Sequence, residues 1–247
     1  MKRAFFAIRS VLAYFTILPA GRFSAGPAPQ TDALSYLPLI GTLIGGVAGG
    51  AAFGLSFIVP HSLVVAAAFT LPILLTGAIH FDGFLDSCDA LFASTTPSRR
   101  LEIFKDPRHG TFAVVGMALL CVVWIAALWP VPSWKYPALL ALTGGVSRLG
   151  AILNARDIPH ARSGAIAAGP HNRLAPGVLV ASALLLFGIS IFVWRWAWFV
   201  LLLVVLCERY GAIRIARALD GGLVGDAYGF LIVSSEVLML AVLGGYA

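Results

Sequence analysis

The chain has 247 residues, of which 60% are hydrophobic and only 11% are charged. A soluble domain of this size carries roughly 25% charged residues, so the composition excludes an ordinary soluble enzyme and predicts an all-α, polytopic membrane protein with the lipid bilayer as a partner. The net charge of +6 does not indicate a nucleic-acid partner, because no basic run is interleaved with aromatic residues. In a membrane protein, basic residues more often orient the spans and meet lipid head groups.

Residues 4–19 form a short apolar stretch that follows Lys2 and Arg3. The stretch is similar to a signal peptide, but Arg9 interrupts it and it lacks a clear small-residue cleavage site. We therefore predict a retained amphipathic helix within residues 1–25 that lies on the membrane interface.

Seven long apolar segments follow, each close to the roughly 20 residues needed to span a bilayer. They cover residues 34–58, 62–80, 112–129, 136–153, 174–193, 197–213 and 228–246. The sequence thus predicts one membrane domain over residues 1–247, a helical bundle with about seven transmembrane helices. The first segment holds two ladders of glycines that would permit close helix packing in lipid; they are Gly41, Gly45, Gly49 and Gly46, Gly50, Gly54.

The basic residues predict the orientation of this bundle. With the N-terminus on the cytoplasmic side, the connections 81–111, 154–173 and 208–227 are cytoplasmic, and the outer connections hold only Lys135 and Arg195 of the 17 basic residues. This positive-inside bias argues against residues 4–19 as a further span, which would invert the arrangement.

The segment His80-Phe-Asp82-Gly-Phe-Leu-Asp86-Ser-Cys-Asp89 concentrates three of the few carboxylates. In a helix, Asp82, Asp86 and Asp89 share an arc of about 60°. Like charges so close repel one another, and a divalent cation is the simplest partner. Carboxylate oxygens suit Mg²⁺, or Mn²⁺, better than zinc. The alternative is an ordinary solvated face.

The next motif is Lys105-Asp-Pro-Arg108-His-Gly110. Pro107 ends a helix and Gly110 permits a tight turn. Asp106 would add a metal ligand, and Arg108 offers a planar fork for phosphate oxygens. Alternatively, the basic residues only mark the cytoplasmic end of the next span.

Three further polar residues lie in or next to apolar segments. Arg148 faces a polar cavity or a partner, or extends to the interface. Glu236 lies inside the last segment and needs a partner, for which Arg148 is the candidate. Asp226 either caps the last helix or adds a carboxylate to the same polar surface.

These motifs resemble the cobalamin synthase family over essentially the whole chain. The segment Gly77 to Ala90 is similar to the family's signature, and Leu101 to Gly110 continues the match. Pro38-Leu-Ile-Gly41, Ser147-Arg148 and Gly225-Asp226 followed by Glu236 match in order. His109 departs from the family's pattern and is given no role, and residues 154–173 match poorly.

The resemblance implies a Mg²⁺-dependent enzyme of the prokaryotic inner membrane, adenosylcobinamide-GDP ribazoletransferase, with its active site on the cytoplasmic face. A hydroxyl of α-ribazole, or of its 5′-phosphate, attacks the phosphorus attached to cobinamide in adenosylcobinamide-GDP. GMP leaves, and adenosylcobalamin or its 5′-phosphate forms in a late step of coenzyme B12 biosynthesis. Association with other B12 assembly enzymes remains open.

On this interpretation the segment 81–111 is the active-site segment. Asp82, Asp86, Asp89 and Asp106 hold one or two metal ions on the diphosphate, and Arg108 contacts phosphate. One of these carboxylates, with Asp89 as the first candidate, serves as general base toward the attacking hydroxyl. The expected further substrate contacts are Lys105, Arg148, Asp226 and Glu236.

Two other classes remain as alternatives. CDP-alcohol phosphotransferases and aromatic prenyltransferases also use spaced aspartates, but the former carry a different continuation and the latter use two Asp-rich helices, of which one is evident. A cation transporter would need carboxylates deep in its spans, whereas here most of them lie at a segment end.

Overall fold

The computed structural model describes residues 2–18, 31–161 and 174–245, and the regular elements of these residues are all helices. In chain order they are α1 (Lys2–Phe15), α2 (Thr31–Leu34), α3 (Leu37–Leu55), α4 (His61–Leu75), α5 (Ile79–Phe92), α6 (Pro97–Ile103), α7 (Thr111–Leu128), the 3₁₀ turn η1 (Ser133–Lys135), α8 (Tyr136–Asp157), α9 (Pro176–Val193), α10 (Ala197–Ala218) and α11 (Gly225–Gly244). The predicted helical membrane bundle is confirmed, and a short apolar helix occupies the N-terminal region.

Five helical stretches of the described residues are long and apolar enough to cross a membrane. They are Asp32–Leu55, Thr111–Leu128, Ser133–Asp157, Pro176–Val193 and Gly225–Gly244. The pair α4 and α5 adds a sixth only as a broken span, because the two helices meet at 93°. The expected span 197–213 is helical within α10, but this helix is not among the five. It carries four charged residues, Glu208, Arg209, Arg214 and Arg217.

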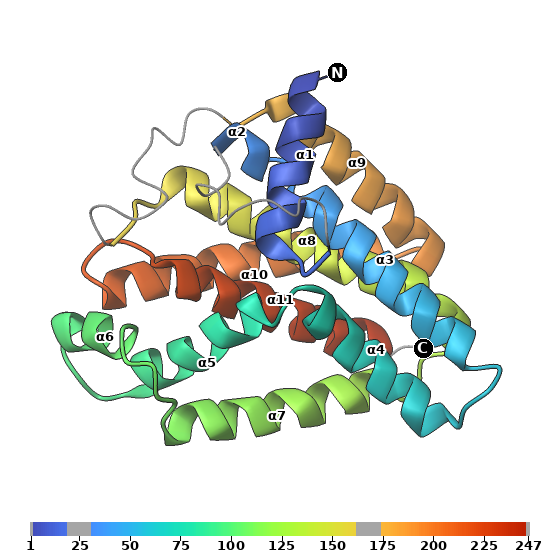
Figure 1. Cartoon of the computed structure of the whole chain (residues 1–247), viewed down its shortest axis with the longest axis horizontal. Helices are drawn as coiled ribbons and strands as arrows, with labels where there is room; N and C mark the ends of the chain where they lie inside the picture. Colours follow the sequence, from blue (N-terminus) through green and yellow to red (C-terminus); the bar gives the residue numbers. More distant parts are fainter. Residues whose placement is uncertain (1, 19–30, 162–173, 246–247) are drawn as a thin grey trace.

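Helix α8 forms the centre of the bundle, and α7 and α9 lie at its edges (Figure 1). The span containing α8 is 78% buried, whereas those of α7 and α9 are each 28% buried. The exposed side chains of α7 and α9 are largely apolar, as expected for helices that face lipid.

One of the two predicted glycine ladders makes the tightest helix contact. A Cβ at Gly41, Gly45 or Gly49 would overlap the backbone of α8, whereas Gly50 and Gly54 have open space around them. The small residues therefore serve to bring the backbones of α3 and α8 together.

The chain breaks sharply between α4 and α5. Gly77 and Ala78 both have positive φ, 59° and 61°, so the helix cannot continue through them. The expected span 62–80 is therefore interrupted at Leu75. Instead of forming a free connection, α5 packs between α7 and α11.

Three connections come together at one end of the bundle. The Ala161 amide donates to the Leu223 carbonyl at 2.8 Å, which joins the α8–α9 and α10–α11 connections. Arg100 of α6 donates to the Ala218 carbonyl at 3.4 Å. The segments that the sequence places on one side of the membrane are thus spatial neighbours.

Candidate active site

The aspartates of α5 form one face of a helix, as their spacing predicts. Exposure falls along this face: the Asp82 side chain is 69% exposed, that of Asp86 is 17% exposed, and Asp89 is buried. Gly83 and Ser87, on the side of α5 that meets α11, contact the backbone of Asp226.

His109 lies over the two outer carboxylates. Its Nδ1 is 3.5 Å from Asp86 Oδ1, and its Nε2 is 3.9 Å from Asp82 Oδ1. Asp86 also feels the like charges of Asp82, Asp226 and Asp89. These four carboxylates therefore concentrate negative charge in one place, and the ionisable ring of His109 lies across from two of them. His109 was given no role from sequence, and its place in the turn beside Arg108 is the only signal that could have pointed to it.

Asp89 has a different environment. Its carboxylate accepts hydrogen bonds from the Gly110 amide and, at 3.0 Å, from the Ala113 amide. It therefore supplies the side-chain cap for the first turn of α7, whose amides have no partners within the helix. This contact locks the turn 106–110 against α5 and favours a positioning role over the proton-accepting role expected from sequence.

The turn before α7 carries a surface ion pair. Arg108 Nε and Nη2 donate to the two carboxylate oxygens of Asp106, each at 2.9 Å. These hydrogen bonds lower the pKa of Asp106 to about 2. The structure thus places Asp106 with Arg108 and not on the α5 face, and Lys105 lies exposed next to them.

Asp226 lies in the first turn of α11, but the N-cap residue is Val224, which makes no side-chain cap. The capping interpretation of Asp226 is therefore not supported. Its negative charge acts on Asp86. Asp226 therefore belongs beside the face of α5 that carries Asp82, Asp86 and Asp89, which we call the acid face.

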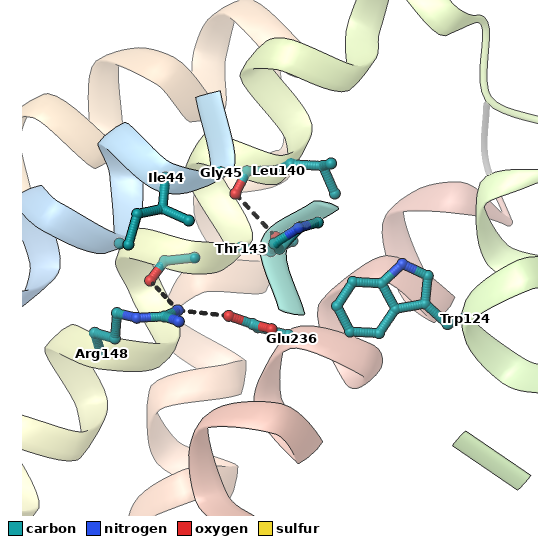
Figure 2. A pocket seen from close by; sticks show the side chains of 10 residues that line it. Ile44, Gly45, Trp124, Leu140, Thr143, Arg148 and Glu236 are labelled. Atoms are coloured by element: carbon teal, nitrogen blue, oxygen red, sulfur yellow. Dashed lines mark hydrogen bonds and ion pairs between the residues drawn. The ribbon is translucent and has the colours of Figure 1, made fainter. Parts of the chain in front are cut away.

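The predicted partnership of Arg148 and Glu236 is confirmed. Arg148 Nη1 pairs with Glu236 Oε1, and the residues are 5% and 8% exposed (Figure 2). The same nitrogen donates to the Gly144 carbonyl at 2.9 Å. The adjoining cavity of about 10 Å³ has room for roughly one water molecule, so this pair is an internal contact of α8 and α11.

A second buried acid, Glu208 of α10, was missed because it stands near the end of an apolar segment, where charges are common. It is 3% exposed and accepts a hydrogen bond from Ser235 at 3.0 Å. Among the described residues, its Oε1 has no hydrogen-bond partner. It packs against Gly150 of α8, where a Cβ would overlap it.

The acid face fits a magnesium site of limited size. No group of three or more His, Cys, Asp or Glu side chains within the described residues is arranged around a common metal position. Mg²⁺, however, is commonly held by one or two carboxylates together with water and substrate phosphates. Asp82 and Asp86 meet that requirement, whereas Asp89 and Asp106 are engaged elsewhere.

Comparisons with known proteins decide the family. The family described as Cobalamin-5-phosphate synthase matches residues 7–244. This chain belongs to that family. Among the similar proteins, the adenosylcobinamide-GDP ribazoletransferase of Deinococcus radiodurans is 34% identical over 98% of this chain and 87% of its own length. That of Desulfitobacterium hafniense is 35% identical over 85% of each chain, and that of Syntrophobacter fumaroxidans is 33% identical over 87% of each. No solved structure matches.

Segments that are far apart in the sequence meet at the acid face, within the part of the chain that matches the cobalamin-5-phosphate synthase family. The segments 77–90 and 101–110 are joined by a hydrogen bond from the Gly110 amide to Asp89. The backbone at Asp226 packs against Gly83 of the same helix. These three parts of the chain therefore meet at α5.

Proposed function

We propose that the chain catalyses the transfer that its relatives' names describe. A hydroxyl oxygen of α-ribazole, or of its 5′-phosphate, attacks the phosphorus joined to cobinamide in adenosylcobinamide-GDP. The bond from that phosphorus to the GMP oxygen breaks, so that GMP leaves and adenosylcobalamin, or its 5′-phosphate, forms. The observation that carries this proposal is the acid face of α5 lying under the turn that bears Arg108, in a chain that matches the family over residues 7–244.

Asp82 and Asp86 would hold Mg²⁺, which when bound neutralises phosphate oxygens. Displacement at a diphosphate depends mainly on positioning and on neutralised charge. The carboxylates of Asp82 and Asp86 and the guanidinium of Arg108 are groups that can meet this requirement. The hydroxyl proton passes to a carboxylate of the acid face.

Arg108 contacts the diphosphate, with Lys105 as a second cation. The Arg108 side chain is 85% exposed, and surface ion pairs are weak because water and salt screen them, so phosphate oxygens can replace Asp106 as its partner. Asp106, freed from this pair, would then be available as a further metal ligand. Asp89 holds the turn in place through Gly110 and Ala113, and Asp226 adds charge beside Asp86.

The site faces the cytoplasm of a prokaryotic cell, at the inner membrane. The basic residues support this orientation, because Lys135 and Arg195 are the only ones assigned to the opposite side. An excess of Lys and Arg marks cytoplasmic connections.

The test is release of GMP by the detergent-solubilised protein given adenosylcobinamide-GDP, α-ribazole and Mg²⁺. We expect release that requires both substrates and stops when a chelator removes Mg²⁺. A cation transporter would release no GMP, and activity that survives chelation would refute the metal assignment.

A further inference from the structure

A groove of about 460 Å³ lies where the end of α1 meets the break between α4 and α5. Tyr14, Thr16 and Ile17 line one side, residues 76–79 line the other, and Asp82 of the acid face completes it. Figure 1 shows the end of α1 beside this break. The two sides are joined, because the Ile17 amide donates to the Leu75 carbonyl at 3.0 Å. The groove is therefore a built feature of the fold.

The backbone beside the groove is strained. Ala78 holds a φ of 61° directly after Gly77 at 59°. A left-handed conformation is uncommon at a residue other than glycine. The Ala78 amide donates to the Ile73 carbonyl at 2.9 Å, so this turn closes the end of α4 and fixes one wall of the groove.

The walls of the groove have the chemistry of a nucleoside site. Tyr14 is 40% exposed, and Ile17 and Ile79 are also exposed, so an aromatic ring and two aliphatic side chains are free to contact a planar base. The Asp82 carboxylate can accept hydrogen bonds from hydroxyl groups. The eight lining residues, all within the described part of the chain, include no Lys or Arg, which disfavours a phosphate inside the groove.

The size and position of the groove further limit which ligand it can bind. The volume falls within the roughly 300–1,000 Å³ of small-molecule pockets; it suits a bicyclic base with a ribose and is too small for a corrin nucleotide. Asp82 belongs to both the groove and the acid face, where it lies near His109. A ribose held at Asp82 therefore has its hydroxyl groups next to the site proposed for the diphosphate.

We propose that this groove binds the acceptor nucleoside of the transfer, with its aromatic base along Tyr14 and Ile79 and its ribose at Asp82. The inference rests on the proposed function and adds a second substrate site to it. A lipid acyl chain is the competing occupant, but it has no use for the Asp82 carboxylate at the groove's end.

The first test fills the groove. Ile17→Trp should weaken binding of α-ribazole alone by about tenfold, because the larger side chain takes up space that the nucleoside would occupy. The measurement is calorimetry on the detergent-solubilised full chain. The KM for α-ribazole should rise by the same factor, and the KM for adenosylcobinamide-GDP should change less than about twofold. Phe6→Trp is the matched control, since Phe6 is an exposed position of α1 outside the groove; it should change neither constant.

The second test removes the aromatic wall. Tyr14→Ala should weaken α-ribazole binding by about two- to tenfold, the range of one aromatic contact, with Phe6→Ala as its control. Elution as a single species and a melting temperature close to that of the wild type show that each variant is folded.

The outcomes separate the two proposals. If the wild type releases GMP but neither variant weakens α-ribazole binding, the groove assignment is wrong and the function stands. The groove assignment is also wrong if either variant raises the KM for adenosylcobinamide-GDP more than the KM for α-ribazole. It is wrong as well if α-ribazole binding is unchanged and the lipid requirement of the protein is altered. If the wild type binds α-ribazole in the groove and releases no GMP, the proposed function fails instead.

Discussion

The acid face of α5 and the Arg148–Glu236 pair place the same chemical group in opposite settings. Asp82 and Asp86 stand beside further carboxylates, with the ring of His109 close to both. Glu236 is buried against a guanidinium and accepts from Ser147 at 3.3 Å. Carboxylates that repel one another at a partly exposed face favour an added cation, whereas a paired carboxylate inside the bundle holds two helices in register.

Breaking the buried pair from one side is expected to have the largest effect. Arg148→Met leaves Glu236 buried without its partner, which typically costs about 3–5 kcal/mol of stability. The melting temperature in detergent should fall strongly, and activity should fall with the amount of folded protein.

The double variant Arg148→Met/Glu236→Leu is the control, because replacing both partners with apolar groups removes the unpaired charge. It should recover most of the stability. If it is stable yet inactive, the pair contacts substrate, as the sequence suggested, and is more than a structural contact.

The acid face is expected to show the reverse pattern, with loss of activity and no loss of stability. Asp86→Asn should lower GMP release at limiting Mg²⁺ by at least about a hundredfold, since even residues that only support a metal ligand contribute 10- to 100-fold. Its melting temperature should stay level or rise, because one of several repelling charges is gone.

Glu102→Gln provides the comparison, since Glu102 is an exposed acid of α6 that pairs with Arg99; it should keep full activity. Full transfer by both Asp82→Asn and Asp86→Asn at limiting Mg²⁺ would refute the metal role of this face.

The buried contact of α3 and α8 can be tested by variants that change no charged residue. Gly45→Ala should destabilise the protein by about 1–3 kcal/mol, because its Cβ would overlap the Leu140 carbonyl of α8. Gly50→Ala, one turn away with open space, should be neutral or stabilising by up to about 1 kcal/mol. Equal melting temperatures for the two variants would contradict the close contact of α3 and α8.

The smallest effect is expected at Asp106. Its pKa is lowered to about 2 by hydrogen bonds from Arg108, below the ordinary value near 3.9. The stabilisation from this pair is therefore complete above about pH 4 and is lost as the pH falls toward 2. The difference in melting temperature between wild type and Asp106→Asn should be small and constant from pH 5 to 8, and should shrink below about pH 4. A difference that changes between pH 5 and 8 would show that another group controls the pair.

Much of the fold follows from local pattern. The predicted segment 112–129 is α7 at 111–128, and 136–153 lies within α8 at 136–157. The sequence does not predict the break after Leu75, because alanine is a good helix former. In the structure Ala78 has a positive φ, and its amide donates to the Ile73 carbonyl at 2.9 Å in the turn that ends α4. The glycine ladder Gly46, Gly50, Gly54 is equivalent to its neighbour in sequence, but only in the other ladder would a Cβ at every glycine overlap the backbone of α8.

Some features of the candidate site also follow from local sequence pattern, and others do not. The shared face of Asp82, Asp86 and Asp89 is a consequence of helical spacing, and the Arg148–Glu236 pair follows from the cost of burying either charge alone. The contacts of His109 with α5, and of Asp89 with the start of α7, join residues about 20 positions apart. No local period predicts such contacts.

The sequence by itself determined the class of the protein, the helical segments and the residue types available for chemistry, because hydrophobicity and spacing act over a few turns of chain. The tertiary structure alone decided which carboxylates remain exposed for a ligand and which are used internally, because that depends on what packs against each side chain. It also decided that α1 meets the α4–α5 break and forms a groove at Asp82.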